Sequence, residues 1–337
     1  MSLEGLPNEL ITQLFLALPT VSSVIAFAST SARFRHVYYG SQRLSILASA
    51  AGAEFGPIAE IVQLVTQNAS QPAHVHRDVP MSAALLHQVI EAGRVAQRWE
   101  ELYPFKKWKT NFAERRLLTD SERFTFRRAL YRLWLYSSAY HTSSHGRTGR
   151  NIQLTTFTRA ALLHNFTTAE LAEMLDVHAV VRDVVANNIC PSNGKVRNRF
   201  RKRHTESTLP SMMFNIHLNY PPPTPASFVS DFIPMSKYHA TPYLEAGAEG
   251  WGDDISHYYV VEDMMKLDPE QLLYLRDHCT SKWQVEDYVR DLGEWFGNNG
   301  ETFSETAAFV TKQRGVDMEI VKTAIDHEEM GVVSGDV

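Results

Sequence analysis

Residues 6–38 read LPNELITQLFLALPTVSSVIAFASTSARFRHVY and open with a short amphipathic segment. Leu6-Pro7 starts the first helix, where proline is tolerated because the first N–H groups of a helix have no partner within it. The apolar residues that follow are spaced for one face of this helix: Leu10, Leu14, Phe15 and Leu18. Pro19 ends the segment. The stretch therefore predicts a helix with a single apolar face.

A second and a third helix are expected directly after Pro19. The apolar residues of the second are Val21, Val24, Ile25 and Ala28. Ser29 to Ser31 separate it from a third segment that contains Arg33-Phe34 and Val37. Periodicity alone fits equally well with ordinary amphipathic helices at the start of a helical domain.

The rest of the chain also favours helices. Two T-x-x-E capping boxes, Thr119–Glu122 and Thr167–Glu170, precede apolar helical repeats. Asp268-Pro269-Glu270 gives a third helix start, with proline at the first helical position. Further helices are expected at 57–67 and 82–102. Period-two alternation is never sustained, so the predicted fold class is all-α or mostly α.

We expect three regions, at residues 4–45, 46–326 and 327–337. The second is an α-helical domain interrupted by a long loop at about 219–254, where proline and glycine are frequent. The third is an acidic, small-residue tail expected to be flexible. Shorter breaks are predicted at 71–80, 141–149 and 190–204.

Composition limits the class of protein. The chain has 337 residues, 44% of them hydrophobic, and a net charge of −5. That charge gives no general attraction to nucleic acid or to anionic membranes. Two cysteines are too few for a disulfide framework, and no signal peptide or membrane-spanning stretch is evident. We therefore expect a cytoplasmic or nuclear protein that binds no membrane, with nucleic acid an improbable partner.

The order of residues in 4–45 resembles the F-box. Members of this family open with Leu-Pro, continue with apolar residues at helical spacing up to a Leu-Phe pair, and close on a small polar segment before a third helix. Leu6-Pro7, Leu14-Phe15 and Arg33-Phe34 fall on this pattern in order. No WD or leucine-rich repeat follows, as in F-box-only proteins. Residues 120–180 resemble the bodies of fungal F-box proteins.

The resemblance implies three helices that bind a Skp-family adaptor protein and, through it, a cullin scaffold. Such a short segment cannot bury both faces of its helices alone, so its outward apolar residues need a partner. The residues that the resemblance assigns to this interface and its supporting core are Leu6, Pro7, Leu10, Leu14, Phe15, Leu18, Val24, Ile25 and Phe34.

A second candidate site is the basic run KVRNRFRKRH at 195–204. Its cations are Lys195, Arg197, Arg199, Arg201, Lys202 and Arg203. They suit phosphate, a phosphorylated substrate or nucleic acid. The alternative is a solvated loop, which the net negative charge of the chain favours.

Signals for chemistry are weak, and no cofactor is expected. His74 with His76, and Asp253, Asp254 and His257, lack the ligand number and spacing of a metal site. No motif of a hydrolase, nucleotide-binding or metalloprotease site is found.

Isolated reactive or aromatic residues have simpler explanations. Cys190 and Cys279 are expected to be packing or surface thiols rather than nucleophiles. The aromatic residues of 131–140 are expected in the core: Tyr131, Trp134, Tyr136 and Tyr140.

Three functions follow from these observations. The first is a non-catalytic, substrate-recruiting subunit of an SCF-type cullin–RING ubiquitin ligase, with a protein as its substrate. The second is a Skp-binding structural or regulatory protein outside a ligase. The third is an enzyme with an unrecognised helical active site.

Overall fold

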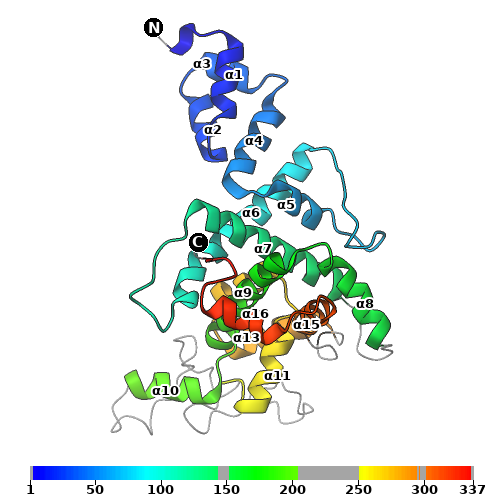
Figure 1. The fold of residues 1–337 in the computed structure, drawn as a ribbon. Helices are drawn as coiled ribbons and strands as arrows, with labels where there is room; N and C mark the ends of the chain where they lie inside the picture. Colours follow the sequence, from blue (N-terminus) through cyan, green and yellow to red (C-terminus); the bar gives the residue numbers. More distant parts are fainter. Residues whose placement is uncertain (1–2, 143–151, 204–249, 294–295, 297–300, 335–337) are drawn as a thin grey trace.

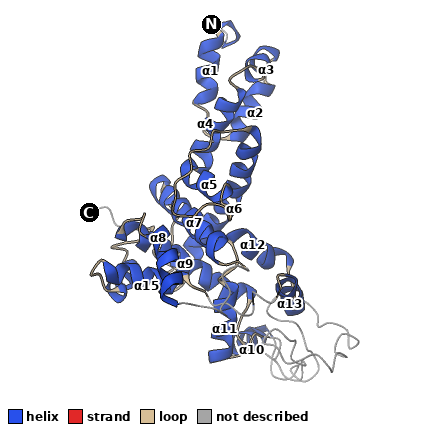
Figure 2. Ribbon diagram, turned by 90° about the vertical axis from the view of Figure 1, so that its right-hand side faces the viewer, coloured by secondary structure: helices blue, strands red, loops and turns tan. Residues whose placement is uncertain are grey.

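A computed structural model describes residues 3–142, 152–203, 250–293, 296 and 301–334. Within these residues every regular element is helical and none is a strand (Figure 2). The fold class is therefore all-α, as predicted. The elements are η1 (Leu3–Gly5), α1 (Asn8–Leu16), α2 (Val21–Ser29), α3 (Ala32–Tyr38), α4 (Arg43–Phe55), α5 (Ile58–Val65), α6 (Ala83–Lys107), α7 (Asp120–Tyr140), α8 (Ile152–Leu163), α9 (Thr168–Val184), the π-helical turn η3 (Val185–Ile189), α10 (Asn193–Arg203), α11 (Asp254–Met264), α12 (Pro269–His278), α13 (Lys282–Asp291), α15 (Phe303–Gln313) and α16 (Met318–Asp326).

The helix starts predicted from capping signals are confirmed. At α7 the Thr119 N–H donates to Glu122 at 2.7 Å, and the Glu122 N–H donates to the Thr119 hydroxyl at 3.3 Å. Thr167 and Glu170 exchange the same pair of hydrogen bonds at the start of α9. At the start of α12, whose first residue is Pro269, the Gln271 N–H donates to the Asp268 carboxylate at 2.8 Å. These reciprocal bonds satisfy donors that a helix cannot pair internally.

The helices from α5 onwards form a body around α6, α7 and α9. Figure 2 shows these long helices crossing at its centre. The aromatic residues of α7 are buried here, Tyr131 and Tyr136 completely. The prediction that they belong to the core is confirmed.

The first three helices and the first part of α4 have a core of their own. Its buried members are Ile11, Phe15, Val24, Ala28, Phe34, Tyr38, Ile46 and Ala50. We call residues 3–50 the N-terminal unit and residues 51–334 the body. The expected boundary at residue 45 falls inside α4, so the unit contains part of a fourth helix. Figure 1 shows this unit projecting from the body.

Helix α4 joins the two cores without a break. Ala50 packs in the N-terminal unit, and Ala51 and Phe55 pack in the body. The last carbonyls of α4 accept hydrogen bonds from α7: Glu54 from Arg127 at 2.5 Å, and Phe55 from the Tyr131 hydroxyl at 2.9 Å. Such bonds satisfy acceptors that a helix end leaves open. The N-terminal unit is therefore held to the body by a helix anchored at both ends.

The described helices differ in length and apolar character. None of them, taken singly, has the length and apolar character needed to cross a bilayer. Helices α4 and α5 meet those criteria only as a pair, which is bent by 102°.

Three sequence expectations differ from the structure. The break predicted at 190–204 is wrong, since α10 occupies most of it. The flexible tail predicted from residue 327 is wrong for Val332 and Val333, which are buried; the Val332 N–H donates to Asp176 at 3.0 Å. Most of the long loop predicted at 219–254 lies outside the described residues, and Asp254 already begins α11.

Candidate functional site

The nine residues assigned to the partner-binding segment fall into three groups of three. Phe15, Val24 and Phe34 are buried in the core of the N-terminal unit. Leu10, Leu14 and Ile25 are exposed by 50%, 38% and 52%. The remaining three complete the set: Pro7 is exposed, and Leu6 and Leu18 are partly buried against the core.

The single apolar face predicted for the first helix is wrong. Helix α1 has two apolar faces, one with Ile11 and Phe15 in the core and one with Leu10 and Leu14 in solvent. Each pair is four residues apart, which places its members one above the other on the helix. The inward face was missed because Ile11 was not counted, although its spacing from Phe15 signals a helical pair.

Aromatic rings hold the three helices together. Phe15 of α1 meets Phe27 of α2 edge-on at 4.9 Å between ring centroids. Phe27 stacks on Phe34 of α3 at 4.6 Å, and Tyr38 lies 5.9 Å from Phe15. Such pairs add about 0.5–1.5 kcal/mol each beyond the area they bury. Phe27 and Tyr38 were not among the predicted core residues.

Polar contacts fix the same helices at their ends. Thr20 and Ser23 form a capping box at the start of α2. The first N–H of that helix, on Val21, donates to the Glu54 carboxylate of α4 at 2.8 Å. Arg33 donates to the Leu6 carbonyl at 2.5 Å, which ties α3 to the segment before α1. The exposed leucines are thus presented by a rigid unit.

An accumulation of exposed apolar side chains characterises this unit. Leu3 and Tyr39 are exposed by 56% and 61%, in addition to the three residues described above. Single exposed apolar residues are common, whereas several on one small unit are typical of a partner-binding surface. We call Leu10, Leu14 and Ile25 the exposed apolar set.

Helix α10 carries residues 195–203 of the basic run, and His204 lies outside the described residues. Lys195 and Arg197 are exposed, and Arg199 donates to the Asn187 carbonyl at 2.6 Å. Arg201, Lys202 and Arg203 lie in the last turn of α10, where the structure does not describe side chains. The alternative of a solvated loop is therefore wrong in its secondary structure.

Two of the residues considered as metal ligands, Asp253 and His257, make other contacts. The Gly194 N–H donates to Asp253 at 2.9 Å, and a ring nitrogen of His257 lies 2.7 Å from the Cys190 carbonyl oxygen. These contacts tie the start of α10 to α11. Across the described ranges, no three His, Cys, Asp or Glu side chains are grouped so as to hold a metal ion.

Both cysteines are buried. Burial raises the pKa of the Cys190 thiol well above its ordinary value and also raises that of Cys279. A buried thiol that resists ionisation is a poor nucleophile.

A buried polar cluster lies between α7, α9 and α15. His141, His178 and Glu301 line a cavity of about 30 Å³ there. Burial lowers the pKa of both histidines to about 3, and burial raises that of Glu301 to about 7. Nε2 of His178 has no hydrogen-bond partner within the described residues, and the Glu301 carboxylate lies 3.7 Å away. The volume suits one water molecule, whereas ligand pockets typically measure about 300–1,000 Å³.

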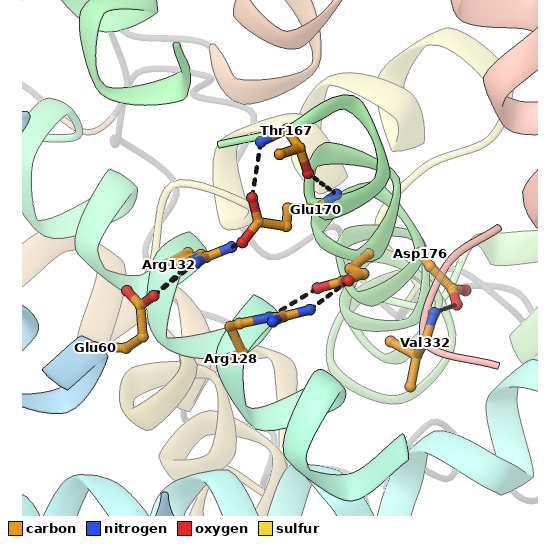
Figure 3. A network of polar contacts seen from close by, with 8 residues as sticks. Glu60, Arg128, Arg132, Thr167, Glu170, Asp176 and Val332 are labelled. Atoms are coloured by element: carbon orange, nitrogen blue, oxygen red, sulfur yellow. Dashed lines mark hydrogen bonds and ion pairs between the residues drawn. The ribbon is translucent and has the colours of Figure 1, made fainter. Parts of the chain in front are cut away.

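An arginine network joins α5, α7 and α9 (Figure 3). Arg132 pairs with Glu60 and Glu170, each at 2.7 Å, and its guanidinium stacks over the Phe166 ring at 4.3 Å. Arg128 forms two hydrogen bonds to Glu173. Because each cation is paired with at least one carboxylate, this network orders the body rather than offering a vacant charge.

Comparisons with known proteins were made for the whole chain. It matches no protein-family model, no curated protein and no solved structure. The residues and their geometry therefore carry the functional interpretation.

Proposed function

We propose that the chain is the substrate-recruiting adaptor subunit of an SCF-type cullin–RING ubiquitin ligase, and that its N-terminal unit binds a Skp-family adaptor. The single observation that carries this proposal is the exposed apolar set on a unit with its own packed core. Fully burying a leucine or isoleucine side chain contributes about 1.5–3 kcal/mol. A partner that covers the exposed apolar set would gain this contribution at each position.

The division of the nine assigned residues supports the proposal. An interface needs outward apolar anchors and an inner set that keeps them in register. Leu10 and Leu14 meet the first requirement, and Phe15 and Phe34 meet the second. The order of these residues is also the order in which the F-box pattern places them.

The shape of the molecule suits recruitment. The N-terminal unit projects from one end, and α10 and α11 lie at the other (Figure 1). A partner bound to α1–α3 would leave that far end open to a substrate. In this proposal the chain makes and breaks no bonds itself, and it raises the local concentration of substrate near the ubiquitin-charged enzyme.

Affinity purification of the tagged chain tests this function. The wild type is expected to recover a Skp-family adaptor together with a cullin, and a Leu10→Ala/Leu14→Ala variant is expected to lose both. Ile320→Ala is the matched control, since Ile320 is an apolar residue of the body that is 66% exposed. Recovery of the adaptor without a cullin would support the alternative role outside a ligase. Undiminished recovery by the folded double variant would contradict the proposal.

A further inference from the structure

We propose that a groove between the C-terminal end of α6 and the connection to α7 docks a protein segment in which a carboxylate side chain neighbours a large apolar one. The groove has a volume of about 330 Å³, and binding pockets typically measure about 300–1,000 Å³. Its lining includes Glu101 and Phe105 of α6 and Arg115 and Leu117 of the connection. We call Phe105, Arg115 and Leu117 the side groove. It shares no residue with the exposed apolar set, so either proposal can fail while the other holds.

The connection between α6 and α7, residues 108–119, is fixed to the body. Trp108 at its start is buried, and its indole N–H donates to the Glu328 carboxylate at 2.7 Å. Leu118 near its end is buried in the core of the body. Arg116 donates two hydrogen bonds to the carboxylate of Glu122 in the first turn of α7, at 2.6 and 2.5 Å. In Figure 1 this connection projects from the side of the body. The groove is therefore preformed, which lowers the entropic cost of binding.

Large apolar side chains gather at the side groove and remain in solvent. Phe105, Phe112 and Leu117 are exposed by 58%, 69% and 78%. Phe105 and Leu117 line the same groove. Phe105 and Phe112 both lie against the guanidinium of Arg115, which is 5.2 and 4.7 Å from their ring centroids. A partner that covers this patch removes apolar surface from water, which favours association.

Arg115 determines the charge of the expected partner. Within the described residues its guanidinium forms no ion pair, and its one hydrogen bond goes to the Trp108 carbonyl at 3.4 Å. Its Nε is buried without an acceptor. Burying part of a cation without an acceptor is unfavourable. A carboxylate matches the planar fork of arginine with two charge-assisted hydrogen bonds. The side groove therefore lacks one negative charge beside its apolar side chains.

The other charges around the groove do not supply that carboxylate. Glu100 pairs with Arg127 at 2.6 Å and lies 3.4 Å from Arg123. Glu101 is exposed and forms no ion pair within the described residues. A basic segment would have only this solvated carboxylate to pair with, and exposed pairs contribute little. Nucleic acid is disfavoured because its binding usually engages many phosphates, whereas Arg115 is the one unpaired cation among the described residues of the groove.

Selection from a phage-displayed library of random peptides on the full-length chain tests the site. The selection is run in parallel on wild type and on Arg115→Gln/Leu117→Ala, and only peptides that bind wild type alone are kept. They are expected to carry Asp or Glu beside a large aliphatic or aromatic residue. Because Leu117 is 78% exposed, the variant should fold, and equal circular dichroism and melting temperature would establish this.

Fluorescence anisotropy of the strongest selected peptide then measures the charged pair. Replacing its carboxylate by an amide, and Arg115→Gln in the chain, are each expected to weaken binding at least about tenfold. Both changes together should weaken it little further, because they remove the same interaction. Arg290→Gln is the matched control, since Arg290 is an exposed arginine paired with Asp287 at 2.8 Å on α13. It should change affinity less than about twofold.

Leu117→Ala measures the apolar part and is expected to weaken binding of the same peptide about tenfold, because the leucine is buried only in the complex. Ile320→Ala is its control, at a side chain that is 66% exposed on α16. Glu101→Gln gives the opposite sign. Removing the rim carboxylate should tighten binding of the acidic peptide about two- to threefold, which a merely structural Arg115 would not produce.

Two results of the selection would overturn the proposal: enriched peptides without a carboxylate, or no peptide that distinguishes wild type from the folded variant. Unchanged affinity of the selected peptide for Arg115→Gln would also overturn it. Tighter binding of oligo(dT) than of the peptide through Arg115 would assign the groove to nucleic acid instead.

Discussion

Phe55 lies at the point where the N-terminal unit meets the body. Its ring rests on Gly93 of α6, and a Cβ at that glycine would overlap the ring close to its attachment. The overlap involves the inner atoms of the side chain, which cannot swing away as a flexible tip could. Gly93 therefore permits α4 to lie against α6.

Gly93→Ala should destabilise the protein although alanine is the better helix former. Overpacking of this kind costs about 1–3 kcal/mol of unfolding free energy, measured by urea denaturation. Gly5→Ala is the control, since no atom lies within 4 Å of its added Cβ. If the Gly93 variant and wild type had equal free energies of unfolding, α4 and α6 could move apart without cost. That result would contradict the prediction.

Glu301 predicts a pH dependence of stability. Burial raises its pKa to about 7 from an ordinary value of 4.5, with repulsion from Glu262 adding to the effect. Between pH 4.5 and about pH 7 the Glu301 carboxyl is protonated in the folded state, whereas in the unfolded state it has lost its proton. The free energy of unfolding therefore decreases as pH rises from about 5 to about 7.

Glu301→Gln should remove that decrease while keeping an oxygen that accepts from the backbone of Ser304. Its stability relative to wild type is expected to increase between pH 5 and pH 8, by up to about 1–3 kcal/mol. Glu305→Gln, at an exposed carboxylate of α15, provides the comparison in parallel urea titrations. If the difference in unfolding free energy between the Glu301 variant and wild type stayed constant with pH, the raised pKa of Glu301 would be contradicted.

At the scale of elements, capping decides where the body helices begin. Thr119→Ala removes the hydroxyl that accepts from Glu122 and should cost about 1 kcal/mol of unfolding free energy. Thr323→Ala is a suitable control, because that exposed hydroxyl only donates to a carbonyl of its own helix, α16. Thermal denaturation of both variants checks this prediction. Equal melting temperatures of Thr119→Ala and Thr323→Ala would show that the cap does not stabilise the protein.

The helix starts were predictable because their bonds join residues three apart in sequence. Helix α10 was not, since its residues are mostly cationic and show no apolar repeat; it is anchored by Val196, which is buried, and by Arg199 on η3. The spacing of Ile11 and Phe15 signals the inward face of α1. Leu10 and Ile11 are nevertheless equally apolar, and only the packing of α3 and α4 decides which of the two is buried. The cavity beside His141 and Glu301 joins residues 160 apart in sequence, for which no local signal exists.

For the whole molecule, the essential feature is the separation of two surfaces by a rigid connection. The N-terminal unit, which carries the exposed apolar set, lies at one end of the molecule, and α10 and α11 lie at the other (Figure 1). Helix α4 contributes to both cores, so the two ends keep a fixed relation. That arrangement suits a chain that holds one partner while presenting another.

The most direct test is isothermal titration calorimetry of the purified chain with a purified Skp-family adaptor. We predict binding with a negative heat-capacity change, which marks apolar burial. Leu10→Ala/Leu14→Ala should weaken it by about 30-fold or more, since truncating a central anchor typically costs about 2 kcal/mol, and Ile320→Ala should leave it unchanged. No binding by the folded wild type, or equal binding by the double variant, would contradict the assignment of the N-terminal unit as an adaptor-docking F-box.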